Sequence, residues 1–467
     1  MFKRIMIFSA GLICTNTYGI TLEEESQEQT TDVASSYLSR GNYLQNPYLG
    51  LPSQGGTANL SESQIASDRI AKRIFADGTW NVMGVASYYD QNGGNNYGFG
   101  VNIFAQTGEI AGFSIGGFLT GVNPYTAQIN PSDPDQQALG LSTKEQLEMQ
   151  EFFVEYKYSD ILQIDAGRIG INNSPWLTYY QNNALNLVTY QGALANIDLG
   201  NHWLITALAF NQAQMLGETG FNNQTYYNSS IDPTLTPDGT SNSTPGTIAA
   251  GLSWNTPTEL LDFRLWGYKF YDYSNLIYAD SNLKLKASDK LNFEIGAQGA
   301  IQFGSDQNIL SNNGLANNVN SKMLGLQLTM NYDWLELKLG YNNIWGPNDS
   351  FEGGNIISPY TYSLATDPLY TTSWMLGLID KSAGQAYKIA PTVKFLDDAL
   401  EVGISAARYN TVTMPASNEY DITFNYNVPQ IKGFTIFAGY GYIVQPIDSE
   451  GNGGNNFEGQ IMLSYLY

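Results

Sequence analysis

Few residues of this sequence could carry out covalent chemistry. Its one histidine, His202, has no serine suitably placed beside it, and its one cysteine, Cys14, lies close to the N-terminus. Activated nucleophiles, disulfide frameworks and His/Cys metal sites are therefore excluded as the basis of a function. Paired carboxylates could hydrolyse glycosides, but no spacing singles out one pair. We expect no enzyme activity, no cofactor and no resident metal.

The ionisable residues are few, and carboxylates outnumber bases. The chain has 467 residues, with 43 acids against 21 bases and a formal net charge of −22. Charged residues make up 14% of the chain, against about 25% in ordinary soluble proteins. Nucleic acid is excluded as a partner class, because phosphate binding requires clustered lysine and arginine. No change of composition divides the chain into several cores, which favours one large structure.

The N-terminal residues have the pattern of an export signal followed by a segment of weak character. Lys3 and Arg4 precede an apolar stretch at 5–13 and small residues near 19, which predicts a signal peptide over 1–19. Residues 20–78 include an acidic run and predict a periplasmic extension, either disordered or with a short helix at 61–75. No later stretch has the 18 or so consecutive apolar residues of a transmembrane helix.

Segments with alternating apolar and polar side chains recur from residue 79 to the C-terminus. In 324–332, leucine, methionine and tyrosine alternate with glycine, glutamine, threonine and asparagine, and residues 333–334 lead directly to another such run. A period of two with one apolar and one polar face is the pattern of a half-buried strand. Eighteen strands are predicted, at 79–90, 97–105, 110–120, 150–158, 161–169, 187–197, 203–211, 247–254, 261–270, 275–286, 291–303, 322–332, 335–344, 385–395, 400–409, 419–427, 434–443 and 457–466.

The connections between these strands alternate between short turns and segments that are mostly long. Turns at 159–160 and 333–334 contrast with segments at 121–149, 212–246 and 345–384. This sorting is typical of an outer-membrane barrel and is not required of a soluble sandwich or propeller. The sequence therefore predicts an all-β fold, a transmembrane up-and-down antiparallel β-barrel of about 18 strands in the bacterial outer membrane. Residues 371–379 could form a nineteenth strand, but strand parity assigns them to an external loop.

Two regions of the sequence resemble the OprD-like (Opr) family of outer-membrane porins, which includes the major porins of Campylobacter-type bacteria. Residues 162–168 (LQIDAGR), with Pro175 and Gln191-Gly192 after them, are similar to the third-loop region of that family, and the C-terminal third up to Tyr467 is similar as well. The resemblance covers about 79–467 and implies an eighteen-stranded barrel whose third loop folds inward and narrows the pore, often with three barrels per assembly. On that basis 170–186 is the constriction loop; a plain external loop is the alternative. Its uncharged residues include Asn172, Asn173, Pro175, Trp176, Tyr179 and Tyr180.

Alternation places many charged side chains on the polar face of the strands, where they would line a water-filled pore. The candidate pore-lining residues are Glu151, Glu155, Asp165, Arg168, Arg264, Asp280, Glu294, Glu336, Lys338, Lys388, Glu401, Asp421 and Glu458. Arg168 has outward parity and reaches the pore only if a bulge precedes the third loop. Members of the resembled family that take carboxylates line one wall with arginines, whereas only Arg168 and Arg264 lie near the middle of the pore here. The excess of acids instead predicts a preference for cations, unless each carboxylate is paired with a neighbouring lysine.

These features predict a porin that allows passive diffusion of ions and small hydrophilic solutes. The expected partners are outer-membrane lipid and lipopolysaccharide, cations and, by the resemblance, further copies of the chain in a homotrimer. Asp133 and Asp135, in a long loop, could bind Ca²⁺ or remain solvated. The alternative function is a surface adhesin or structural protein whose long external loops bind host or matrix.

Overall fold

The computed structural model describes residues 72–74, 78–91, 94–124, 146–171, 174–177, 188–214, 220–225, 243–256, 260–304, 318–357, 359–360, 368–379, 382–447 and 454–466. The predicted signal peptide, most of the predicted extension and the candidate Ca²⁺ ligands Asp133 and Asp135 lie outside these residues.

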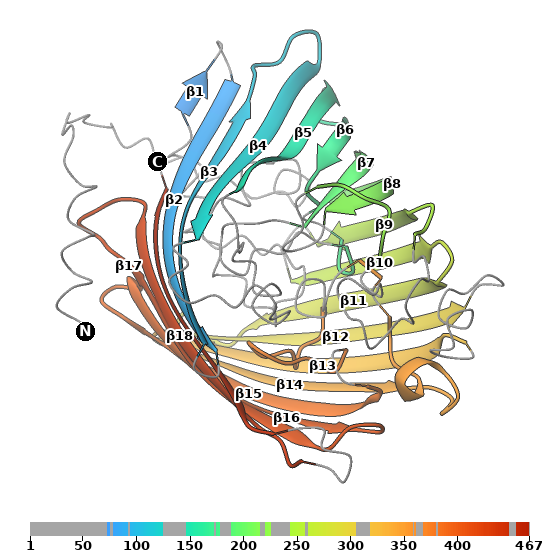
Figure 1. Ribbon diagram of the computed structural model, residues 1–467, viewed down its shortest axis with the longest axis vertical. Coiled ribbons are helices and arrows are strands. Elements are labelled where there is room, and N and C mark those ends of the chain that lie inside the picture. Colours follow the sequence, from blue (N-terminus) through green and yellow to red (C-terminus); the bar gives the residue numbers. More distant parts are fainter. Residues whose placement is uncertain are drawn as a thin grey trace. The chain divides into compact units, whose positions relative to one another are not determined.

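Strands make up most of the described chain, and they follow one another in the sheet in chain order (Figure 1). They are β1 (Lys72–Ile74), β2 (Gly78–Gln91), β3 (Gly94–Gln106), β4 (Phe113–Pro124), β5 (Gln146–Tyr158), β6 (Leu162–Ile169), β7 (Thr189–Gly200), β8 (Trp203–Gln214), β9 (Thr247–Asn255), β10 (Leu261–Phe270), β11 (Ser274–Lys286), β12 (Leu291–Gly304), β13 (Asn320–Tyr332), β14 (Leu335–Trp345), β15 (Gly384–Phe395), β16 (Leu400–Thr411), β17 (Ser417–Asn427), β18 (Phe434–Val444) and β19 (Asn456–Leu466).

The sheet closes on itself because β19 pairs antiparallel with β2, with Ile461 opposite Tyr88. Strands β2 to β19 therefore form a closed barrel of 18 of the 19 strands, and the predicted fold class is confirmed. The remaining strand, β1, pairs with the first residues of β2, with Lys72 opposite Trp80. The predicted helix at 61–75 is wrong for these three residues. β19 reaches β2 only from Met83 onward, and the backbone groups of β2 before that point are free to pair with a strand.

Barrel strands have an exposed apolar face and a covered face that on most strands holds several polar residues. On β5, Phe152 and Val154 are exposed, whereas Glu151 and Glu155 are buried. An exposed apolar face around the whole sheet is what contact with lipid requires, and the polar face then points into the barrel. We call these the outer face and the inner face.

Connections at one end of the barrel, the short-turn end, are all brief, at 107–112, 159–161, 201–202, 256–260, 287–290, 333–334, 396–399 and 428–433. Asn201 and His202 both have positive φ, which suits a two-residue hairpin turn. The other end, the long-loop end, has connections at 92–93, 125–145, 170–188, 215–246, 271–273, 305–319, 346–383, 412–416 and 445–455. The predicted sorting of turns and loops is therefore confirmed, although three connections at the long-loop end are also short. Within the described residues, no helix is long and apolar enough to span a membrane.

Candidate pore constriction

The connection between β14 and β15 places residues 368–379 against the inner face of the barrel, and we call these residues the inner segment. Four of its residues are fully buried, although they belong to a connection between strands at the long-loop end: Leu369, Thr371, Thr372 and Leu378. The inner segment contains no strand, so 371–379 belongs to a loop as predicted, but this loop folds against the inner face and is not external. A loop inside a barrel narrows the space left for water and solutes.

Hydrogen bonds from three inner-face side chains hold the backbone of the inner segment. The Tyr409 hydroxyl lies 2.9 Å from the carbonyl oxygen of Thr371 and 2.8 Å from that of Leu376. Lys388 Nζ donates to the carbonyl oxygen of Thr372 at 2.6 Å, and Glu419 Oε1 accepts from the Met375 N–H at 2.6 Å. Because backbone groups buried in a protein need partners, these side chains fix where the inner segment can lie.

Glycines on the inner face make room for the two largest aromatic side chains of the inner segment. A Cβ atom at Gly439 of β18 would lie 2.3 Å from the Trp374 ring, and one at Gly296 of β12 would lie 2.8 Å from the Tyr370 hydroxyl oxygen. A Cβ at Gly340 of β14 would meet the Tyr370 carbonyl oxygen at 2.6 Å. A Cβ atom at any of these positions would force the inner segment or the wall to shift, so the glycines shape the wall to receive this loop.

An earlier part of the same connection is also fixed inside the barrel. Ile356 and Ile357 are fully buried, and Gln302 of β12 both donates to the Ile357 carbonyl at 2.9 Å and accepts from its N–H at 2.8 Å. Asn355 Nδ2 donates to the Ile379 carbonyl at 3.0 Å, which joins the two parts of the connection.

The third loop of the barrel, after β6, touches the inner face over strands β10 and β11. Ser174 Oγ lies 2.9 Å from the Tyr268 hydroxyl, and Trp176, which is fully buried, meets Tyr278 edge to face at 6.1 Å between ring centroids. Pro175 between them is buried as well. The described start of this loop thus folds inward as predicted. Asn172, Asn173, Tyr179 and Tyr180 lie outside the described residues.

Seven of the predicted pore-lining residues lie on the inner face but are covered, with exposed fractions of 8% or less. They are Glu151, Glu155, Asp165, Arg264, Asp280, Asp421 and Glu458. Arg264 forms a two-point ion pair with Asp280, in which Nε donates to Oδ1 at 2.9 Å and the second bond joins NH2 to Oδ2. The Tyr278 hydroxyl also donates to Asp280, at 2.9 Å. The charge of Arg264, the one arginine on the inner face among the side chains that the structure describes, is therefore compensated within the wall.

The remaining predicted charges on the inner face are half-buried: Glu294, Glu336, Lys338, Lys388 and Glu401. Four of them lie near the short-turn end with Asp262, Lys284 and Lys394, and we call this set the charge band: Asp262, Lys284, Glu294, Glu336, Lys338, Lys394 and Glu401. Two ion pairs run along it, Lys338 to Glu336 at 2.9 Å and Lys394 to Glu401 at 3.8 Å. The alternative that acids are paired with neighbouring lysines is thus realised for these two glutamates.

The geometry contradicts the placement of Arg168 on the pore wall. Arg168 is directly opposite Phe152, whose side chain is 55% exposed on the outer face. Its guanidinium donates to the Met149 carbonyl at 3.5 Å and lies 4.6 Å from the centre of the Phe221 ring. Side chains opposite one another on antiparallel strands share a face. Arg168 therefore lies on the outer face, and no bulge turns it toward the pore as the prediction required.

Sequence reasoning did not identify the 346–383 connection as part of the constriction. The signal was its composition, because Ile356, Ile357, Trp374, Met375 and Leu376 are unusual in a solvated loop. Trp374 lies within 371–379, the segment that the sequence allowed as a further strand.

The fold resembles solved structures of outer-membrane channels of the Occ/OprD family. OccAB3 from Acinetobacter baumannii superposes with a TM-score of 0.69 at 13% identity, over 84% of this chain and 99% of that one. OccK8 (OprE) from Pseudomonas aeruginosa gives 0.70 at 13% identity, over 85% and 99%, and OccK2 (OpdF) from the same organism, solved with glucuronate, gives 0.66 at 11% identity, over 85% and 99%. No family model and no curated protein matches the sequence. Likeness at this identity establishes the fold, and the resemblance to Campylobacter-type porins rests on the sequence motifs alone.

Proposed function

We propose that this chain is an outer-membrane porin through which ions and small hydrophilic solutes diffuse passively. The observation that carries the proposal is the closed barrel with an exposed apolar outer face and a polar, charged inner face. Such a wall separates lipid from water and is costly to maintain unless water occupies the inside. The fold shared with Occ/OprD channels supports the same function.

A preference for cations is part of the proposal, and it rests on the charges of the inner face. The charge band holds four carboxylates against three lysines, and Asp280 compensates Arg264. A wall with an excess of carboxylates concentrates cations and lowers the local concentration of anions.

Recording from the purified protein in planar bilayers tests both parts. Stepwise conductance is expected, and its absence would refute the channel function. In a KCl gradient the reversal potential should have the sign of cation preference; the opposite sign would overturn the charge argument while leaving the porin proposal intact.

The solute class can be tested with two sugars of similar size and opposite charge. OccK2 was solved with glucuronate, an anion, but in this chain the inner-face arginine is already bound to a carboxylate. Liposome swelling should therefore be faster with glucosamine than with glucuronate, and equal or reversed rates would show that the inner charges do not select solutes.

A further inference from the structure

Four cationic side chains lie on the outer face, which in a membrane meets lipid. They are Arg168 on β6, Lys269 on β10, Lys322 on β13 and Arg408 on β16, and all four are exposed. Each is directly opposite an exposed apolar side chain of a neighbouring strand, namely Phe152, Ile248, Ile301 and Tyr387 in that order. These pairings put the four cations on the lipid side of the wall.

All four lie at the long-loop end of their strands. Arg168 and Lys269 are the next-to-last residues of β6 and β10, and Lys322 is the third residue of β13, which runs the other way. Arg408 is three positions before the last residue of β16. Among the strand side chains that the structure describes, the lysines and arginines of the outer face therefore lie only at the long-loop end. We call these four residues the cationic rim.

The cationic rim differs from the inner face in how its charges are compensated. Several inner-face cations form ion pairs with carboxylates, as in the pairs of Lys157 with Glu155 and Lys338 with Glu336. Among the described residues, no carboxylate lies within ion-pair distance of a rim cation. Their observed partners are neutral: Lys269 lies over the Tyr271 ring at 4.8 Å, and Arg408 donates to Asn410 and Asn418. In a chain with 43 acids against 21 bases, four cations on one rim with no carboxylate partner among the described residues point to an anionic partner outside them.

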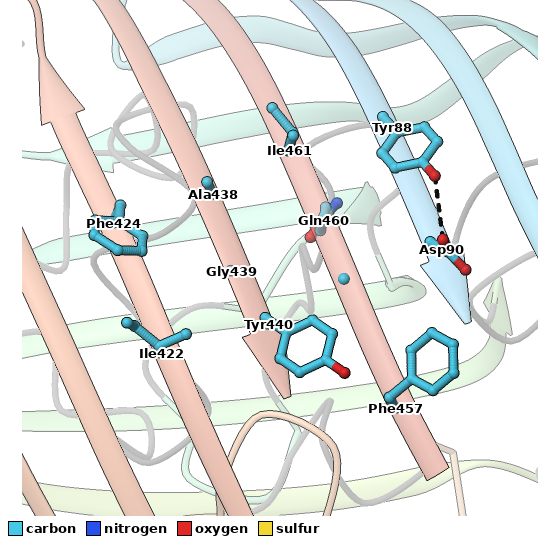
Figure 2. A pocket seen from close by; sticks show the side chains of 11 residues that line it. Tyr88, Asp90, Ile422, Phe424, Ala438, Gly439, Tyr440, Phe457, Gln460 and Ile461 are labelled. Atoms are coloured by element: carbon cyan, nitrogen blue, oxygen red, sulfur yellow. Dashed lines mark hydrogen bonds between the residues drawn. The ribbon is translucent and has the colours of Figure 1, made fainter. Parts of the chain in front are cut away.

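The rest of the perimeter has the opposite character. Across β17, β18, β19 and β2, the outer face holds a hollow of about 320 Å³ lined by aromatic side chains, including Tyr440 and Phe457 (Figure 2). Asp90 lies in this hollow and accepts from the Tyr88 hydroxyl at 3.2 Å; within the described strand residues it is the only outer-face carboxylate. An anionic headgroup would be repelled here and attracted to the arc from β6 to β16.

We propose that the cationic rim binds the phosphate groups of outer-leaflet glycolipid, each cation contacting a separate headgroup. This rests on the proposed function, because it requires a barrel in an outer membrane with its long loops outside. The rim positions are three or four strands apart, which at about 4.8 Å per strand gives roughly 14–19 Å between neighbours. That spacing suits a row of lipids around the barrel, and long cationic side chains reach the headgroup level from an apolar surface.

Native mass spectrometry of the detergent-purified protein tests whether the cationic rim binds lipid phosphates. Two probes are compared: lipid A with both of its phosphates, and the same lipid after phosphatase treatment. The phosphorylated form should bind more tightly to the wild-type protein. Each of Arg168→Gln, Lys269→Gln, Lys322→Gln and Arg408→Gln should remove about one tightly bound phosphorylated lipid, and the quadruple variant should bind both forms equally. Inorganic phosphate should not compete at the concentration of the lipid; if it does, the rim is a site for free anions and the proposal is wrong.

The matched control replaces three cations at the short-turn end, Lys286, Lys290 and Lys432, by glutamine. Two of them are paired with Asp289 and Asp333, so this variant should bind lipid A as the wild type does. Heat-modifiable migration in electrophoresis confirms that each variant is folded. A folded quadruple variant that still prefers the phosphorylated form, or a control that loses the preference, overturns the proposal. Bilayer recording separates it from the proposed function: the quadruple variant should conduct as the wild type does, and absence of conductance in both would refute the porin function alone.

Discussion

A methyl group at position 439 should loosen the constriction, because Gly439 is where the wall receives Trp374. An added Cβ would stand 2.3 Å and 2.4 Å from two atoms of the indole ring and 3.0 Å from the Phe437 ring. The indole must move by about 1 Å to restore ordinary carbon contacts. Overpacking of this kind costs about 1–3 kcal/mol, which multiplies the ratio of displaced to seated inner segment by about 5 to 150.

The strain in Gly439→Ala does not exceed what holds the indole in place. Trp374 is 5% exposed, and a buried tryptophan removes about 150–250 Å² from water, which contributes roughly 4–6 kcal/mol. Most molecules should therefore keep the inner segment seated, and the displaced state should be populated transiently. In single-channel recordings, Gly439→Ala should show brief transitions to a higher conductance that are rare in the wild type.

The matched control is Gly459→Ala on β19, the strand next to β18. There the nearest atom to an added Cβ is in the Tyr440 ring at 3.5 Å, an ordinary contact. Gly459→Ala should record as the wild type does. If both variants gave the same traces, or if Gly439→Ala only lowered the conductance, the inner segment would not be the element that limits the pore.

Three further predictions concern charged groups. Glu336→Gln combined with Glu401→Gln removes the carboxylate partners of Lys338 and Lys394 and leaves two carboxylates against three lysines in the charge band. The reversal potential in a KCl gradient should therefore move toward anion preference, and an unchanged value would show that these carboxylates do not face the ion path. Asp280→Asn removes the carboxylate that neutralises the buried Arg264 guanidinium and should cost about 3–5 kcal/mol of stability, measured by thermal unfolding. Adding Arg264→Gln to this variant should restore much of the lost stability. No loss of stability in Asp280→Asn would contradict the pairing. Burial raises the pKa of Glu352 from its ordinary 4.5, against an opposing hydrogen bond from Thr413. Because the pKa of Glu352 is raised in the folded protein, its contribution to stability is complete below pH 4.5 and is lost as pH rises through the raised pKa. Channel noise from the 346–383 connection should therefore grow over that pH range in the wild type and stay constant in Glu352→Gln.

The strands could be predicted because alternation is a local property of the sequence, and the barrel could be predicted because its connections are sorted by length. Strand limits were less certain. The predicted strand at 110–120 begins only at Phe113, since Ile110 bridges to Phe113 and the residues between them, Ala111 and Gly112, have positive φ. A tight turn of this kind leaves the alternation of its flanks almost unchanged, so the pattern alone does not show where it begins.

The inner segment could not be predicted by the same reasoning, because its position depends on residues far apart in the chain. Space for Tyr370 and Trp374 is provided by Gly296, Gly340 and Gly439 on three different strands. Each of these glycines is unremarkable in its own strand, and they form a receiving surface only once the barrel has closed. Strand parity alone assigned Arg168 to the outer face, where the structure places it, and only the supposed bulge was wrong. Parity could not show that loops cover many of the inner-face charges.

The separation of the two faces also explains how this fold persists at 11–13% identity over 84–85% of the chain. The outer face needs only to be apolar, and the inner face needs only to be polar, so almost every position can change within its class. Solute preference depends on the part that is least constrained, the arrangement of charges inside. Here that arrangement binds Arg264 to Asp280 and leaves carboxylates in excess in the charge band. A channel that shares the backbone was solved with glucuronate, an anionic sugar, whereas we propose that this one favours a cationic sugar. The comparison of glucosamine with glucuronate therefore tests the inner charges rather than the fold.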